Sequence, residues 1–392
     1  MARVPIAVLA ACMLFTGSLF TIVLKLQDTE VVGHRPDGTP ITFRHPALQT
    51  ACMFAGEALC LIPHFIWRWS RRGLRTPTDR AASDARHRAA AWAFGLPALC
   101  DAGGTTMLNL GLYYTSASAC QMLRGTLVVF AGLLTITVLK RKLYAHHWAG
   151  ITLICAGAAL AVGVGHHNTS APNPLLGNLL VILAQLLAAC QFIGEEKLLT
   201  QHRAPVLLAV GVEGAWGLAI AALALPLLSV VRGRGGEPLD SLPDALRALR
   251  ASPRLQWTTA AAVASIGAFN FFGVSVTKNL SGGSRAAIDA CRTLFVWLFS
   301  LWAGWERAHV LQLVGFVVLI SGTSVYNEIL RSPSGRGGGA LGASTASVSV
   351  LASSVSATAL ADESGGSDGE GEPARWQPSP GRSRRGEYGR TP

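Results

Sequence analysis

The sequence predicts an all-α integral membrane protein with ten transmembrane helices, arranged as two inverted repeats of five helices. Half of its 392 residues are hydrophobic and only 14% are charged, and the mean hydropathy is +0.38. Apolar runs of about 20 residues recur along the chain, each long enough to cross ~30 Å of hydrocarbon as a helix. An arginine inside one run recurs later with similar neighbours, which indicates an internal repeat. The predicted helices span 5–26, 46–69, 89–112, 117–138, 147–165, 175–197, 207–231, 256–277, 286–304 and 309–329.

The first run, VPIAVLAACMLFTGSLFTIVL, has a basic residue, an apolar centre and small residues, as a secretory signal does. It is longer than the apolar region of a signal peptide, and nine similar runs follow it. We therefore predict an uncleaved first transmembrane helix.

The cysteines and the missing motifs argue against a metal site or an enzyme. All eight cysteines lie inside apolar runs, where we predict small core residues rather than disulfides or zinc ligands. The chain contains no GxxxxGK[ST], HExxH or CxxC motif, and GxSxG occurs only at 365–369, in the segment after the last predicted helix. This argues against a primary pump and against the common membrane hydrolases. No enzymatic activity, cofactor or metal is predicted.

The positions of the basic residues predict the orientation of the chain. A net charge of +11 would indicate nucleic-acid binding in a soluble protein, but here loops between spans hold many of the basic residues. The loop after the second helix holds Arg68, Arg71, Arg72, Arg75, Arg80, Arg86 and Arg88, and the loop after the fourth holds Lys140, Arg141 and Lys142. Loops 113–116 and 166–174 hold no Lys or Arg, so we predict cytosolic N- and C-termini. Segment 232–255 departs from this rule, with five arginines beside three acids.

The segment after the last helix, 331–392, is rich in Gly, Ser and Ala, with an acidic patch followed by a basic end. It has too little apolar surface to form a core, so we predict a disordered cytosolic tail. Asn168-Thr169-Ser170 is a glycosylation sequon on the predicted non-cytosolic side, in a loop whose shortness argues against its use.

The repeat relates the fourth and fifth predicted helices to the ninth and tenth. Met122-Leu123-Arg124-Gly125-Thr126-Leu127 aligns with Ala290-Cys291-Arg292-Thr293-Leu294-Phe295, and Gly150 and Gly157 align with Gly315 and Gly322. The halves are therefore 1–165 and 166–330. Because five helices is an odd number, the second half enters the membrane inverted, an architecture that secondary transporters use to alternate between two states.

Polar residues inside the predicted helices identify candidate site residues, because polar groups in hydrocarbon are costly unless they face an interior cavity. The candidates for solute binding are Arg124, Gln121, Arg292, Asp289, Lys278, Asn270, Asn109 and Thr105. Asp101, Glu57 and Glu213 are candidate proton carriers, since burial disfavours an ionised carboxylate.

Each candidate has a structural alternative. Asp289 and Arg292 are three residues apart on one helix and can neutralise each other. Arg124 has no acid within one turn of its own helix. Its partner is therefore either an acid of another helix, namely Glu57, Asp101 or Glu213, or an anionic group of the solute. Glu195, Glu196 and Lys197 fall near a helix end and are predicted to be solvated interfacial charges.

Several blocks of sequence, in order, resemble the solute carrier 35 family, subfamily F, in the drug/metabolite transporter superfamily. They are Tyr113–Ser118, Gln121–Gly125, Glu195–Lys197, Glu213-Gly214, Asn270–Lys278, Asp289–Thr293 and Gly304–Glu306. The resemblance covers roughly residues 5–330. It implies ten helices in two inverted halves, alternating access around a central cavity, and a lysosomal, late endosomal or Golgi membrane, with a mitochondrial membrane as an alternative.

From these observations we predict a secondary active transporter of a small anionic or phosphorylated metabolite, similar to the nucleotide-sugar transporters. Arginines suit such a solute because guanidinium binds oxyanions through paired hydrogen bonds. The predicted partners are this solute and membrane lipid, with no nucleic acid, and the sequence is compatible with a homodimer. The alternative is a membrane scaffold or adaptor acting through its tail and loops. A channel fits the scattered polar faces less well, and no catalytic constellation supports a membrane enzyme.

Overall fold

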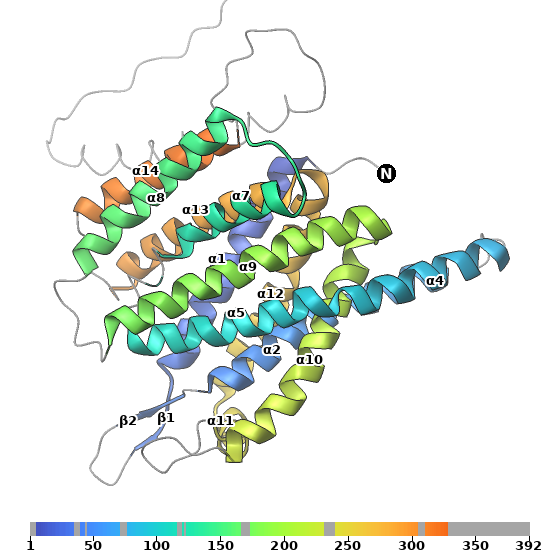
Figure 1. The fold of residues 1–392 in the computed structure, drawn as a ribbon. Helices are drawn as coiled ribbons and strands as arrows, with labels where there is room; N and C mark the ends of the chain where they lie inside the picture. Colours follow the sequence, from blue (N-terminus) through green and yellow to red (C-terminus); the bar gives the residue numbers. More distant parts are fainter. Residues whose placement is uncertain are drawn as a thin grey trace, which may run out of the picture. The chain divides into compact units, whose positions relative to one another are not determined.

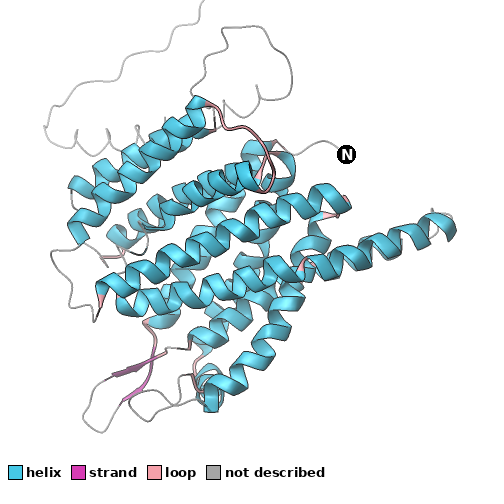
Figure 2. Ribbon diagram, viewed as in Figure 1, coloured by secondary structure: helices cyan, strands magenta, loops and turns pink. Residues whose placement is uncertain are grey.

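A helix lies in each of the ten predicted segments, and the predicted all-α class is confirmed (Figures 1 and 2). The computed structural model describes residues 5–34, 40–43, 45–70, 77–115, 120, 123–165, 173–230, 240–304 and 310–327, all within one compact unit. The helices are α1 (Ile6–Asp28), α2 (Pro46–Ala58), α3 (Leu61–Ser70), α4 (Pro77–Ala93), α5 (Gly95–Tyr114), the 3-10 helix η2 (Arg124–Thr126), α7 (Leu127–Thr137), α8 (Ala145–Gly165), α9 (Pro174–His202), α10 (Val206–Val230), α11 (Leu242–Ala251), α12 (Pro253–Asn279), α13 (Gly282–Trp302) and α14 (Val310–Tyr326). The predicted tail and Asn168 lie outside the described residues.

Length and composition make several of these helices suitable for crossing a membrane. Five apolar segments are long enough to do so: Ile6–Asp28, Pro46–Ser70, Pro174–His202, Val206–Val230 and Pro253–Asn279. Shorter apolar helices cover Arg124–Thr137, Ala145–Leu160 and Leu313–Tyr326. The chain is therefore a multi-pass membrane protein.

The structure differs from the sequence prediction at three helices. Much of the arginine-rich segment before α5 forms helix α4 rather than a loop, and its far end extends beyond the neighbouring helices (Figure 1). The second predicted helix is interrupted between α2 and α3. The ninth begins at Gly282 instead of residue 286, because the Ser281 side chain accepts a hydrogen bond from the Ser284 backbone N–H and caps the helix.

Four helix pairs make the most extensive contacts: α8 with α14, α5 with α9, α1 with α12, and α2 with α10. Small residues permit these close approaches. A Cβ added to Gly157 would lie 2.6 Å from the Gly315 carbonyl oxygen, and one on Gly150 would lie 2.8 Å from that of Gly322. The two glycine pairs that the sequence repeat aligned therefore pack against each other, with α8 and α14 antiparallel.

A short hairpin lies at one end of the bundle. Strands β1 (Val31–His34) and β2 (Pro40–Thr42) pair antiparallel between α1 and α2. Phe43 is buried beside Ala245 of α11 and Leu255 of α12. Asp240 accepts hydrogen bonds from His45 at 2.7 Å and from the Ala47 backbone N–H at 2.8 Å.

Acids at this end of the bundle neutralise some of the arginines in segment 232–255, the segment that departed from the positive-inside rule. Arg254 forms an ion pair with Glu30 (3.3 Å), and Arg247 forms one with Asp244 (3.0 Å).

Candidate functional site

Four carboxylates from four helices form what we call the acidic cluster: Glu57 of α2, Asp101 of α5, Glu195 of α9 and Glu213 of α10. Glu57, Glu195 and Glu213 are buried, and Asp101 is partly buried. The structure brings together the three acids that the sequence identified as candidate proton carriers and adds Glu195, which the sequence had suggested was solvated.

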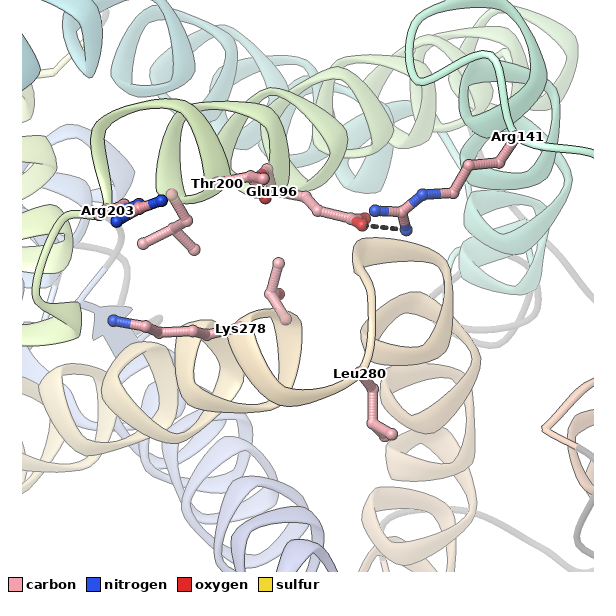
Figure 3. Close-up of a pocket in the computed structure, with 8 residues that line it drawn as sticks. Arg141, Glu196, Thr200, Arg203, Lys278 and Leu280 are labelled. Carbon is pink, nitrogen blue, oxygen red and sulfur yellow. Dashed lines mark hydrogen bonds and ion pairs between the residues drawn. The ribbon is translucent and has the colours of Figure 1, made fainter. Parts of the chain in front are cut away.

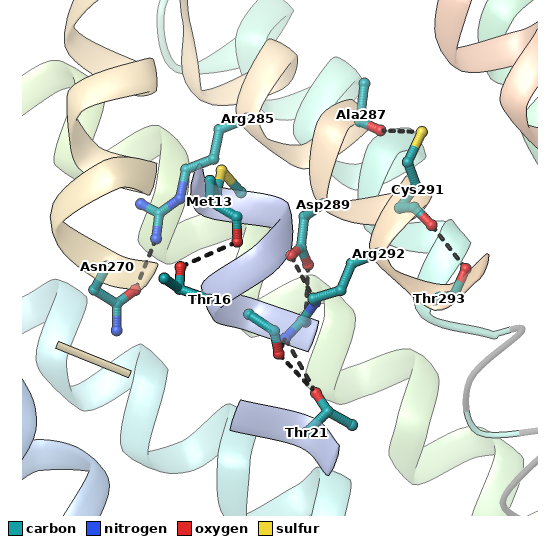
Figure 4. A network of polar contacts seen from close by, with 12 residues as sticks. Met13, Thr16, Thr21, Asn270, Arg285, Ala287, Asp289, Cys291, Arg292 and Thr293 are labelled. Carbon is teal, nitrogen blue, oxygen red and sulfur yellow. Dashed lines mark hydrogen bonds and ion pairs between the residues drawn. The ribbon is translucent and has the colours of Figure 1, made fainter. Parts of the chain in front are cut away.

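Arg285 of α13 is the cation of the acidic cluster, and its side chain is fully buried. Its Nη1 donates to Glu195 Oε2 at 2.6 Å. Its Nη2 donates to Asn270 Oδ1 at 3.0 Å, as Figure 4 shows. The guanidinium carbon also lies 3.9 Å from the centre of the Phe192 ring, within cation–π range. Two donated hydrogen bonds and a ring therefore fix the orientation of this charge.

Amide side chains connect the remaining acids. Asn270 Nδ2 donates to Glu57 Oε1 at 2.6 Å, so one asparagine links Glu57 to Arg285. Gln191 Nε2 donates to Glu213 Oε1 at 2.7 Å. Thr105 Oγ1 donates weakly to Asp101 Oδ1 at 3.4 Å. One hydrogen-bonded chain thus joins Glu57, Arg285 and Glu195 through Asn270, while Glu213 and Asp101 have separate partners and lie close enough for the charges of the acids to interact.

The predicted arginine pair lies outside the acidic cluster, with Arg292 further along α13 and Arg124 in η2. Arg292 is buried, and its Nε lies 3.0 Å from Asp289 Oδ1. Its Nη1 reaches α1 at the Gly17 carbonyl oxygen (3.4 Å) and Thr21 Oγ1 (3.5 Å), as Figure 4 shows. The neutralising partner that the sequence suggested for Arg292 is therefore present.

Arg124 is half-buried at the start of η2, and its charge is close enough to repel that of Arg292. Among the described residues it has no hydrogen-bond or ion-pair partner. The three acids considered as its partners belong to the acidic cluster instead.

Lys278 lies apart from both groups. It lines a cavity of about 280 Å³ with Arg141, Glu196, Leu199, Thr200, Arg203, Thr277 and Leu280 (Figure 3). Its Nζ donates to the Ala204 carbonyl oxygen at 2.9 Å. Glu196 is buried there and accepts hydrogen bonds from Arg141 at 2.5 Å and from the Gly282 backbone N–H at 2.7 Å. The prediction of a solvated interfacial charge is therefore wrong for Glu196 as well as for Glu195.

The other predicted site residues are distributed as follows. Asn109 is partly buried on the same face of α5 as Thr105 and Asp101. Gln121 lies outside the described residues. Within the ranges that the structure describes, no three His, Cys, Asp or Glu side chains are placed to hold a metal ion.

Sequence reasoning missed Arg285 because the predicted ninth helix began one residue after it. Arg285, Asp289 and Arg292 are spaced i, i+4 and i+7, which places all three on one face of α13. The Ser281 cap is the signal that would have included Arg285 in the helix.

Comparison with known proteins identifies the class. Residues 46–163 match the model of the EamA-like transporter family. The chain is 36% identical over 338 residues to human solute carrier family 35 member F6, covering 84% of this chain and 90% of the relative, and 35% identical to the mouse protein over 333 residues. An uncharacterized protein of Schizosaccharomyces pombe is 29% identical over 326 residues, which cover 82% of this chain and 97% of that protein.

One solved structure, described as a crystal structure of a protein, shares the fold of this chain with a TM-score of 0.54 and 14% sequence identity. The match covers 83% of this chain and 99% of the chain in that structure. The apolar helices and the EamA match define a multi-pass membrane protein of a transporter class. Within that class, the chain belongs to the solute carrier 35 family, which confirms the resemblance found in the sequence.

Proposed function

We propose that this protein is a secondary active transporter that moves a small anionic or phosphorylated metabolite by alternating access. Membership of a transporter family supports the class, and the buried ionisable groups support a solute site. We place the protein in an intracellular membrane, either lysosomal, late endosomal or Golgi, with its N- and C-termini in the cytosol.

The helix pairing supports two inverted halves of five helices, 1–165 and 166–330. In the proposed repeat, the helices of the first half (α1, α2–α3, α5, α7 and α8) correspond in order to those of the second half (α9, α10, α12, α13 and α14). Replacing each helix by its counterpart converts the contact α5–α9 into the contact α12–α1. The contacts α2–α10 and α8–α14 are unchanged, because each joins a helix to its own counterpart. These are the four most extensive pairs, and this exchange relation supports the two inverted halves that we propose.

The observation that carries the proposed solute is the arginine pair. Arg124 and Arg292 occupy aligned positions in the two halves, and their charges repel each other. Among the described residues, Asp289 is the one acid that pairs with either guanidinium group, which leaves excess positive charge that a phosphate or carboxylate group of a solute would balance.

Uptake by purified protein in liposomes tests this function. Liposomes preloaded with nucleotide sugars, nucleotides, organic phosphates or amino acids would be given the same pool in labelled form. We expect saturable exchange of an anionic pool, lost in Arg124→Ala/Arg292→Ala. Arg247→Ala is the matched control, because Arg247 is exposed on α11 and pairs only with Asp244 among the described residues. Normal exchange by the folded double variant would contradict the assigned site.

A further inference from the structure

The acidic cluster contains more negative charge than its single arginine can balance. Among the described residues, four carboxylates face the one positive charge of Arg285, so full ionisation of this group would leave a net charge of −3. Burying unbalanced charge of this size is strongly unfavourable, and proteins avoid it by binding a cation or by protonation.

Individual atoms show where positive charge is missing. Among the described residues, buried Glu57 Oε2 and Glu195 Oε1 accept no hydrogen bond. The Glu195 and Glu213 carboxylates also lie close enough for their charges to repel each other. Like charges in a buried site disfavour ionisation of both groups, and a proton on one of them removes the repulsion.

The packing around the acidic cluster favours a proton over a larger ion. A Cβ added to Gly214 would lie 2.6 Å from the Glu57 Cβ, and one added to Gly273 would lie 2.7 Å from Arg285 Nε. The backbone at these two glycines therefore packs directly against the Glu57 and Arg285 side chains and leaves little space for a larger ion. The described residues also provide no metal-binding set.

We propose that the acidic cluster is the proton-binding site of the transporter and that Arg285 is its fixed counter-charge. A carboxylate takes up a proton from one side of the membrane, forming an O–H bond, and releases the same proton to the other side. Arg285 is a positioning residue, since it holds Glu195 in place and keeps it ionised after the protons leave. This inference rests on the proposed function, because it names the coupling ion.

Other ionisable groups near the acidic cluster contribute less. Cys60 lies beside Glu57, Cys100 lies beside Asp101, and the charge of Arg292 interacts with that of Arg285. Thiols remain neutral at physiological pH in such surroundings, and Arg292 has its own acid, Asp289. The proton exchange is therefore assigned to the four carboxylates.

Infrared spectroscopy of the purified protein tests the proposal without any transport measurement, so its result is independent of whether a solute is found. The carboxylic-acid band would be followed across a pH titration in sodium-free buffer. We expect a buried component that titrates in the wild-type protein and is reduced in Glu195→Gln. Glu196→Gln is the matched control, because the neighbouring glutamate is equally buried but lies outside the acidic cluster.

Substitution of Arg285 separates the counter-charge role from simple packing. Arg285→Met is expected to move the titration midpoint upward by roughly 1–3 pH units, while Arg285→Lys, which keeps the charge, stays closer to wild type. A band that does not change with pH in the wild-type protein would overturn the proton site. Equal midpoints for Met and Lys variants would overturn the role of Arg285, and displacement of the protons by added sodium would assign the site to a metal cation. If Arg285→Met does not fold, the Glu195→Gln and Arg285→Lys spectra still decide the matter.

Discussion

The acidic cluster and the arginine pair both include an arginine on one face of α13, but each arginine is held differently. Arg285 receives its support from other helices, through Glu195, Asn270 and the Phe192 ring. Arg292 is paired with Asp289 of its own helix and contacts the backbone of α1. The first group has excess negative charge and the second has excess positive charge. Two charge imbalances of opposite sign along one helix suit two different ions, a proton and an anionic solute.

The largest expected effect is on the stability of the acidic cluster. Glu195→Ala leaves Arg285 buried without its carboxylate, which should lower the free energy of unfolding by about 3–5 kcal/mol. In the double variant Glu195→Leu/Arg285→Met, both charges are gone, so much of that loss should be recovered. Thermal unfolding in detergent, with retained binding of a conformational antibody as the measure of fold, checks both. Equal losses in the single and double variants would show that the ion pair is unimportant.

The two members of the arginine pair should behave differently from each other. Arg292→Ala leaves Asp289 partly buried and unpaired, so we expect destabilisation of about 2–4 kcal/mol. Arg124→Ala removes a side chain that has no partner among the described residues, so the free energy of unfolding should change by roughly 0.5 kcal/mol or less, while solute exchange is lost. Parallel unfolding and exchange measurements test the contrast. A large loss of stability in Arg124→Ala would favour a structural salt bridge instead.

Glycines next to the arginines report how firmly each side chain is held. An added Cβ at Gly273 would lie 2.7 Å from Arg285 Nε, and one at Gly17 would lie 2.8 Å from Arg292 Cδ. Alanine at either position should cost about 1–3 kcal/mol, because neither arginine can move without losing its partners.

Gly194 provides the control for this comparison, since its nearest atom would be 3.7 Å away. Gly194→Ala should be neutral or slightly stabilising because alanine favours a helix. Unfolding midpoints of the three variants measure the difference, and similar values for all three would mean that the arginines are loosely held.

The smallest effect on the free energy of unfolding is expected at the hairpin end of the bundle, where the ion pairs are exposed. Arg254 is two-thirds exposed where it pairs with Glu30. Exposed ion pairs contribute little, so Arg254→Ala should change the free energy of unfolding by about 1 kcal/mol or less. Chemical denaturation at low and high salt would detect any contribution, since screening should remove it.

Helix positions were predictable from the sequence because membrane-spanning segments must be long and apolar, whereas the site was predictable only in part. Glu57, Asp101 and Glu213 stood out as acids in apolar runs. Glu195 and Arg285 did not, because both lie near segment ends where hydropathy alone cannot separate a buried charge from a solvated one. Their burial depends on how α9 and α13 pack, a tertiary property. The hairpin and α11 were missed for a similar reason, since short polar elements leave no periodic signal.

The most direct test of the central claim is whether a pH gradient alone can drive solute accumulation. Purified wild-type protein would be placed in liposomes with an imposed pH difference and offered the labelled pools, beside Glu195→Gln and the control Glu196→Gln. We predict saturable accumulation above the equilibrium level, which disappears when the gradient is collapsed and is lost in Glu195→Gln. Uptake that is unaffected by the gradient would contradict proton coupling, and no uptake from any pool by folded, correctly inserted protein would contradict the transporter itself.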